Sequence, residues 1–385
     1  MLISFTVGNF LSFNEDQEFS MIAGPSADHK NHIKMQNGVD ILRFGAIYGP
    51  NASGKSNLIK ALFYAKSAFF GGYLSEEDRG YGLSGNLAYR NVSGIQSTEP
   101  SRFKFVFSTE KGVYQYGFDY NTATLRHVSE WLVRVGSDSD ELIFNIDYTN
   151  SDNNQFCSDS LNRVFNDFRL SERRDSHNSV PFVLFYLSEN DSLSEEFEYI
   201  FDWFDNLLVQ TSVDDPLYFG FNPGFLDCLC DYLQQLDTGI TGYRLVPVFS
   251  DLSEEFLHIE KQVFTPFGRL YSNAVSYDYS TYTPFFNGFS NECPYTLVSF
   301  ANNIFVAVRS SDDGILFAEL QFQHNSSNHY FSFSQESEGT KKLIRLLSNI
   351  LGETSHSIVS VIDEIECNVH PLAIRNIISK FLSDD

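Results

Sequence analysis

The stretch GAIYGPNASGKSNLIKAL, residues 45–62, decides the fold. A short apolar segment comes first, a turn of small residues follows, and a helical pattern of apolar residues begins after it. The turn matches the G-x-x-x-x-G-K-[ST] phosphate-binding loop without a gap. Such a loop directs backbone N–H groups toward phosphates at a helix N-terminus. The predicted binding residues are Gly49, Pro50, Asn51, Ala52, Ser53, Gly54, Lys55, Ser56 and Asn57.

Two side chains of this loop have chemical roles. Lys55 is predicted to place a positive charge on the β- and γ-phosphates, and we count it among the catalytic residues. The hydroxyl of Ser56 is predicted to bind Mg²⁺. The loop therefore indicates a nucleoside triphosphate and Mg²⁺ as cofactors.

A second acidic site is expected in SIVSVIDEIE, residues 357–366. Its apolar residues predict a buried strand, and Asp363 and Glu364 follow at the carboxyl end, where ligands bind in open α/β sheets. Asp363 is predicted to hold Mg²⁺ through water, and Glu364 to orient or deprotonate the attacking water. An apolar strand followed by two acids is common, so this assignment depends on the loop at residues 49–56.

A third candidate site lies in QESEGTKK, residues 335–342, at the start of a predicted helix over residues 339–351. Ser337 and Gly339 are predicted to meet the γ-phosphate of a nucleotide held by another subunit. A helix cap formed by Ser337 and Thr340 explains the same residues, and both interpretations stay open.

These three motifs resemble the Walker A, signature and Walker B/D-loop motifs of ABC-type ATPases. GPNASGKSN, QESEGTKK and VIDEIECNVHP carry the resemblance, together with the N-terminal VGNFLSF. The chain resembles the ABC/SMC-like, RecF-type P-loop ATPases of bacterial anti-phage defence modules, such as the ATPase subunits of PARIS, Septu and abortive-infection systems. One departure is Glu338, which stands where the family has a signature glycine.

The resemblance implies ATP as the nucleotide and an ATP-sandwich dimer or higher homo-oligomer. Lys55, Ser56, Asp363 and Glu364 of one subunit would then act with the signature residues of a neighbour. His370 falls near the D-loop, where it either contacts the other subunit or begins the helix before Pro371. The implied function is an ATPase that acts as sensor and scaffold and controls a separate effector, expected to be a nuclease. The implied trigger is a phage-encoded protein or damaged DNA.

The predicted fold is α/β: an ABC-type ATPase head, with a mixed sheet, helices and an antiparallel β part, and an inserted α+β middle region. Residues 1–150 form the N-terminal ATPase lobe, 151–330 the inserted region, and 331–385 the C-terminal lobe. Strands are predicted over residues 1–24, 41–49 and 240–333, with three more over 101–135. Helices are predicted over 53–70, 192–210 and 222–239, the last ending at Gly239, and over 370–385.

Composition limits the partners. The net charge of −24 repels the phosphate backbone of nucleic acid and argues against direct DNA binding, although it also serves solubility. The alternative function, a RecF/SMC-like repair ATPase that binds DNA, is therefore less favoured, as is a clamp that binds ATP without hydrolysing it. The five cysteines form no CxxC pair and indicate free thiols in a reducing compartment. No long apolar run is present, so a cytoplasmic protein without membrane contact is expected.

Overall fold

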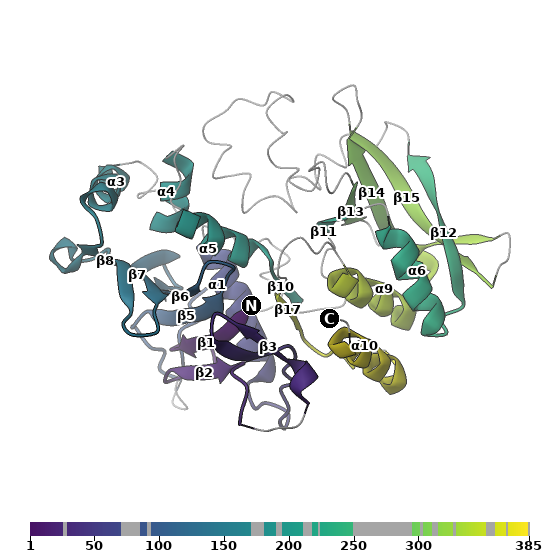
Figure 1. Cartoon of the computed structure of the whole chain (residues 1–385), viewed down its shortest axis with the longest axis horizontal. Helices are drawn as coiled ribbons and strands as arrows, with labels where there is room; N and C mark the ends of the chain where they lie inside the picture. Colours follow the sequence, from purple (N-terminus) through teal and green to yellow (C-terminus); the bar gives the residue numbers. More distant parts are fainter. Residues whose placement is uncertain are drawn as a thin grey trace. The chain divides into compact units, whose positions relative to one another are not determined.

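The chain forms two compact units, which are described separately (Figure 1). The first contains residues 1–209 and 357–361, and the second contains residues 210–356 and 362–385. The predicted boundaries at 150 and 330 follow motifs and composition rather than chain contacts, and they stay a prediction. The computed structural model describes residues 1–25, 29–70, 85–90, 94–170, 181–189, 195–210, 218–221, 224–248, 295–300, 303–309, 315–325, 329–351, 359–366 and 369–383.

A seven-stranded antiparallel sheet forms the first unit, in the order β2-β1-β5-β6-β7-β8-β9. Its strands are β1 (Leu2–Gly8), β2 (Gln17–Ser20), β5 (Ser101–Ser108), β6 (Val113–Asn121), β7 (Arg126–Val135), β8 (Glu141–Asp147) and β9 (Gln155–Phe156). The other elements are β3 (Ile33–Gln36), β4 (Val39–Leu42), α1 (Lys55–Phe69), α3 (Asp159–Leu170), α4 (Phe182–Glu189), α5 (Glu195–Asp205), β10 (Leu207–Gln210) and β17 (Val359–Ile362). The last residues of β10 and β17 belong to the second unit.

Aromatic side chains on one face of this sheet form the core of the first unit. The alternation of β5 places three phenylalanines on one face, and Phe103, Phe105 and Phe107 are all fully buried. α1 and α5 cover them: Phe69 of α1 stacks on Phe204 of α5 at 4.1 Å between ring centroids, and Trp203 stacks on Phe107 at 4.4 Å. This packing accounts for much of the aromatic content of the sequence.

The structure confirms the strands predicted from alternation over 1–24 and 101–135. The strand predicted over residues 41–49 is only partly right. β4 ends at Leu42, and residues 44–50 lie in no regular element, with Tyr48 91% exposed. An apolar run favours an extended chain, but a β-strand also needs a hydrogen-bonded partner strand. The pairing of β4 with β3 ends at Leu42 and does not extend into residues 44–50.

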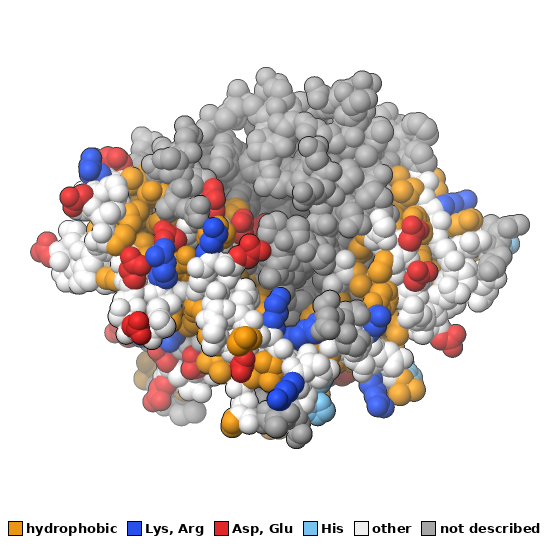
Figure 2. All heavy atoms as spheres, in the orientation of Figure 1, with side chains coloured by type: hydrophobic (Ala, Val, Ile, Leu, Met, Phe, Trp, Pro, Cys, Tyr) orange, Lys and Arg blue, Asp and Glu red, His pale blue; other side chains and the backbone are white. Residues whose placement is uncertain are grey.

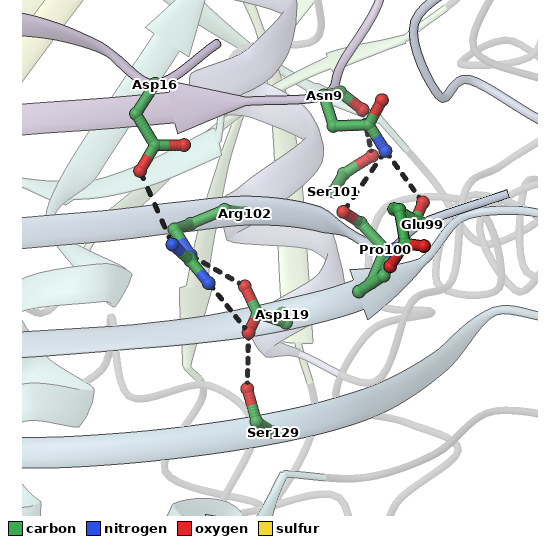
Figure 3. Close-up of polar contacts among 8 residues, drawn as sticks. All are labelled: Asn9, Asp16, Glu99, Pro100, Ser101, Arg102, Asp119 and Ser129. Atoms are coloured by element: carbon green, nitrogen blue, oxygen red, sulfur yellow. Dashed lines mark hydrogen bonds and ion pairs between the residues drawn. The ribbon is translucent and has the colours of Figure 1, made fainter. Parts of the chain in front are cut away.

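The loop between β1 and β2, residues 9–16, is held to the sheet at both ends (Figure 3). The side-chain amide of Asn9 donates to the Glu99 carbonyl oxygen at 2.7 Å, and Ser101 Oγ donates to the Asn9 carbonyl at 2.6 Å. At the other end, Arg102 binds Asp16 at 3.5 Å and Asp119 at 2.9 Å. The loop is therefore fixed in place by contacts with β5 and β6.

The second unit is built on a six-stranded sheet, in which the order is β11-β13-β14-β15-β12 and β16 pairs with β15. Its strands are β11 (Tyr218–Phe221), β12 (Ile240–Val248), β13 (Tyr295–Phe300), β14 (Asn303–Arg309), β15 (Ile315–His324) and β16 (Tyr330–Ser332). The helices are α6 (Phe225–Gln235), α9 (Glu338–Leu351) and α10 (Pro371–Ser383). Leucine and isoleucine side chains of all three helices share one core with β13, β14 and β15.

The helix predicted over residues 222–239 is confirmed as α6, but its end is different. α6 ends at Gln235, and Asp237 adopts the left-handed conformation with φ 58°. The amide of Thr238 then donates to the Leu233 carbonyl, which completes a Schellman-type cap. Asp237 therefore stops the helix two residues before Gly239. In the region predicted as strands over 240–333, the described residues form β12 to β16, while residues 249–294, 301–302, 310–314 and 326–328 lie outside the described chain.

On the face shown in Figure 2, acidic and basic side chains are interspersed over the described surface. Among the described residues, Cys157, Cys228 and Cys230 form no disulfide, which agrees with the predicted thiols, and Cys293 and Cys367 lie outside the described residues. In the part of the chain that the structure describes, no helix combines the length and the apolar character needed to cross a membrane.

Candidate functional site

The loop predicted to bind phosphate forms a tight turn before α1 in the first unit. Ala52 and Gly54 both adopt the left-handed conformation, with φ of 64° and 96°. A Cβ at Gly49 would lie 2.8 Å from Ser53 Oγ, and one at Gly54 would lie 3.1 Å from Ser12 Oγ. Gly54 is therefore required by its backbone conformation, and a Cβ at Gly49 would have to displace the Ser53 hydroxyl.

The N-terminus of α1 is open to an anion. Gly54 occupies the N-cap position without a side-chain cap, and the first turn contains no acidic residue. The loop from Gly49 to Ser53 and the side chain of Ser56 are exposed. Uncapped N–H groups at a helix start carry partial positive charge and bind phosphate well. The residues present thus fit a nucleotide phosphate chain.

Lys55 bends back over its own loop. Its Nζ donates to the carbonyl oxygens of Gly49 at 2.7 Å and Pro50 at 2.9 Å. The ammonium group is therefore held against the first two residues of the loop. Phosphate oxygens carry more negative charge than these carbonyls, so a bound triphosphate would compete for the same ammonium group.

Replacing Lys55 with Met is expected to weaken ATP binding about tenfold or more, because the loop loses its only positively charged side chain. The dissociation constant of ATP, measured by titration with a fluorescent analogue and competition by ATP, tests this. Lys60→Met on the same helix is the matched control and should change the constant less than about twofold. An unchanged constant for Lys55→Met would contradict the assignment.

Ser12 is a neighbour of the loop that sequence reasoning missed. Asn57 Nδ2 donates to Ser12 Oγ at 2.9 Å, and Ser12 also lies against Gly54. The loop between β1 and β2 thus forms a wall of the phosphate-binding turn. The segment VGNFLSF, residues 7–13, contains Ser12 and already contributes to the family resemblance, which was the available signal.

Lys66, in the last turn of α1, links this helix to the end of α5 and the start of β10, the strand that pairs with β17. Its Nζ donates to the carbonyl oxygens of Asp205 at 3.0 Å and Leu207 at 2.8 Å. Burial lowers the pKa of Lys66 to about 8, and the charge of Asp205 opposes this effect. The amide of Val359 in β17 donates to the Asn206 carbonyl between the same two residues. The end of α5 therefore anchors both α1 and β17.

The predicted acidic pair follows β17, as expected from the sequence. Asp363 is half-buried, and its Oδ1 accepts a hydrogen bond from the Glu364 amide at 3.0 Å. Glu364 is exposed and has φ of 47°, which is uncommon for a residue with a side chain. Its carbonyl oxygen accepts a hydrogen bond from Lys342 of α9. The Glu364 carboxylate is thus presented to solvent from a tightly held backbone.

Ser337 caps α9, which supports one of its two interpretations. Its Oγ accepts from the Thr340 amide at 3.1 Å and lies 2.8 Å from Thr340 Oγ1. Gly339 is half-buried in the first turn. Glu338, the departure from the family pattern, is paired with Lys341 at 2.9 Å. A phosphate contact at Ser337 and Gly339 stays a proposal.

Two histidines near these motifs have structural partners. His324 Nε2 lies 2.8 Å from Glu336 Oε1, and the Glu336 carboxylate is buried directly before Ser337. His370 Nδ1 accepts from the Leu372 amide at 3.2 Å, so His370 caps α10 as one of its two interpretations predicts. A contact of His370 with another subunit stays a prediction.

The structure groups the predicted site residues in two sets. The loop from Gly49 to Asn57 lies in the first unit, and Ser337, Gly339, Asp363 and Glu364 lie in the second. Within the second unit, Lys342 joins α9 to Glu364. The described residues contain no cluster of three or more His, Cys, Asp or Glu side chains that could hold a metal. Mg²⁺ commonly takes only one or two protein carboxylates together with phosphate oxygens.

Comparison with known families identifies one family whose sequence model matches the chain. The sequence model of the family described as "AAA domain, putative AbiEii toxin, Type IV TA system" matches residues 44–384. No curated protein matches the chain. The match contains the phosphate-binding loop, the acidic pair and α9, and the mixed α/β architecture agrees with an AAA-type P-loop fold. On the extent of this match, the chain belongs to the AAA-domain family of P-loop ATPases.

Proposed function

We propose that this protein binds and hydrolyses ATP in a Mg²⁺-dependent reaction. The observation that carries the proposal is the turn at residues 49–56. It has two left-handed residues, two glycines in close contact and an uncapped helix N-terminus beside an ammonium group. Membership of the AAA-domain family supports the same conclusion.

We assign the predicted site residues the following roles in this reaction. Bound Mg·ATP supplies the electrophilic γ-phosphate. Lys55 neutralises phosphate charge, while the Ser56 hydroxyl and the Asp363 carboxylate are the oxygen ligands suited to the metal. Glu364 carries an exposed carboxylate on a fixed backbone and takes a proton from the attacking water.

We further propose that two or more copies share the nucleotide in an ABC-type sandwich. The start of α9 supports this, since it holds a hydroxyl and a glycine at a helix N-terminus. The negative charge of Glu338 would oppose a phosphate there, and its pairing with Lys341 offsets that charge. Ser337 and Gly339 of a neighbouring copy would then contact the γ-phosphate.

The biological role that we propose is the sensor and scaffold subunit of an anti-phage defence system, which controls a separate nuclease effector. The description of the matched family, which names a toxin of a type IV toxin–antitoxin system, supports a role in this class of systems. The formal charge of −24 favours protein partners over DNA.

The catalytic part is tested by measuring phosphate release from ATP by the purified chain, with Mg²⁺ and with EDTA. We expect a kcat on the order of 1–100 per second or lower with Mg²⁺, and we expect hydrolysis to be abolished by EDTA. Absence of Mg²⁺-dependent turnover, for the chain alone and with its genomic neighbour, would overturn the proposed activity.

The role as scaffold is tested by the mass of the native assembly. Light scattering of the chain co-purified with the product of the adjacent gene, with and without Mg·ATP, should show one large complex that contains both proteins. A monomer that dimerises only with ATP and binds duplex DNA at physiological salt would favour the repair-type alternative instead.

A further inference from the structure

The backbone of Glu364 is held from both sides. On one side, its amide donates to Asp363 Oδ1 at 3.0 Å. On the other side, its carbonyl oxygen accepts from the ammonium group of Lys342. Lys342 is only 4% exposed, and a lysine is rarely buried to this extent without polar partners. Between these two contacts, Glu364 adopts the left-handed conformation.

We propose that Lys342 is a positioning residue for Glu364 and that it couples the start of α9 to the catalytic carboxylate. This inference rests on the proposed role of Glu364 in ATP hydrolysis. A hydrogen bond to the carbonyl fixes the peptide plane that follows Glu364, and the left-handed conformation is unfavourable unless the surroundings impose it. The two contacts therefore determine where the Glu364 carboxylate is directed.

The coupling follows from the position of Lys342 on α9. Ser337 and Gly339 lie at the start of the same helix, less than two turns before Lys342. The buried side chains of Leu343, Ile344 and Leu347 follow it and pack in the core of the second unit. A short, well-packed helix moves as one body, so a ligand that shifts its N-terminus also shifts the Lys342 ammonium group. Contact between a neighbour's nucleotide and α9 would thus be felt at Glu364 in the same chain.

The neighbouring lysine offers a matched control. Lys341 also lies in the first turns of α9, but its Nζ pairs with Glu338 at 2.9 Å instead of contacting the acidic pair. The substitutions Lys342→Met and Lys341→Met therefore remove the same charge from adjacent positions, and only the first removes the contact to Glu364.

The experiment compares the wild type with Lys342→Met, Lys342→Arg and Lys341→Met by kcat, KM and ATP dissociation constant, with melting temperature as the control for folding. For Lys342→Met we expect kcat to fall about tenfold or more while the dissociation constant changes less than about twofold. Lys342→Arg keeps a charged donor and should restore part of kcat. Lys341→Met should keep kcat within about twofold of the wild type.

Hydrogen–deuterium exchange supplies a readout that does not depend on turnover. Amides in residues 363–366 should exchange faster in Lys342→Met than in the wild type, and Lys341→Met should leave them unchanged. If the wild type hydrolyses ATP and Lys342→Met keeps its kcat, the inference is wrong while the proposed function stands. Faster exchange with an unchanged kcat would overturn the inference in the same way.

Two further outcomes also test the inference. If the wild type shows no hydrolysis, both the proposed function and the positioning role fail together. If Lys342→Met does not fold, the inference is tested with Lys342→Arg. A kcat below that of the wild type, with normal ATP binding and faster exchange at residues 363–366, supports the inference. Exchange at the wild-type rate in this region overturns it.

Discussion

Replacing Glu364 with Gln is expected to lower the rate of ATP hydrolysis about 10²- to 10⁴-fold and to leave ATP binding close to wild type. Gln has nearly the shape of Glu but cannot accept the proton of the attacking water. Glu364 is exposed, so the substitution buries no unpaired group, and the backbone contacts to Asp363 and Lys342 involve main-chain atoms that the variant retains. The loss should therefore appear in kcat and not in the dissociation constant.

The measurement is steady-state phosphate release together with ATP binding by titration. Glu366→Gln is the matched control, because Glu366 is also an exposed carboxylate of the same loop and lies two residues further on. Its kcat should stay within about twofold of the wild type. Turnover that persists unchanged in Glu364→Gln would exclude Glu364 as the catalytic base, and another carboxylate would have to be sought.

Replacing Glu130 with Ala is expected to lower the free energy of unfolding of the first unit by about 3–5 kcal/mol. The Glu130 carboxylate is fully buried in β7. It accepts hydrogen bonds from the Tyr116 and Tyr148 hydroxyls and from the amides of Phe182 and Val183, at 2.7 Å for Phe182. Burial raises the pKa of Glu130, and these four donors oppose the shift. Alanine would leave all four donors without this acceptor.

The two amides are the first of α4, so Glu130 caps a helix that starts 52 residues later in the chain. Glu130→Gln should lose about 1–3 kcal/mol, since its NH₂ group cannot accept from an amide. Urea unfolding followed by tryptophan fluorescence reports this unit selectively, because both tryptophans, Trp131 and Trp203, belong to it.

Glu141→Gln, at an exposed carboxylate in β8, is the control and should change stability by less than about 0.5 kcal/mol. If Glu130→Ala unfolds at the same urea concentration as this control, the carboxylate does not hold α4 on the sheet.

Local patterns predicted much of this fold. The hairpins over residues 101–135 follow from strict alternation between turns that contain Lys111-Gly112 and Asn121-Thr122. The phosphate-binding turn also needs only eight consecutive residues, and its glycines have the conformations and contacts that the motif requires. Each of these features is decided by neighbours in sequence, which is why the sequence was sufficient.

Features that depend on distant residues could not be predicted. Residues 44–50 have the composition of a strand, but strand pairing is a property of the partner. Glu130 looks like a polar residue on an alternating strand, and its partners lie 14–53 residues away. Lys342 resembles any charged residue in the first turns of a helix, and only the fold shows that it lies against Glu364.

The loop between β1 and β2 determines where a truncated fragment of this protein can begin. The family match begins at residue 44, yet β1 is an internal strand between β2 and β5, and Ser12 closes one side of the phosphate-binding turn. A fragment that starts at residue 44 would leave the backbone hydrogen-bonding groups along the edge of β5 open to pairing with other chains. A soluble, nucleotide-binding fragment must therefore retain the first strands, although the family's own boundary excludes them.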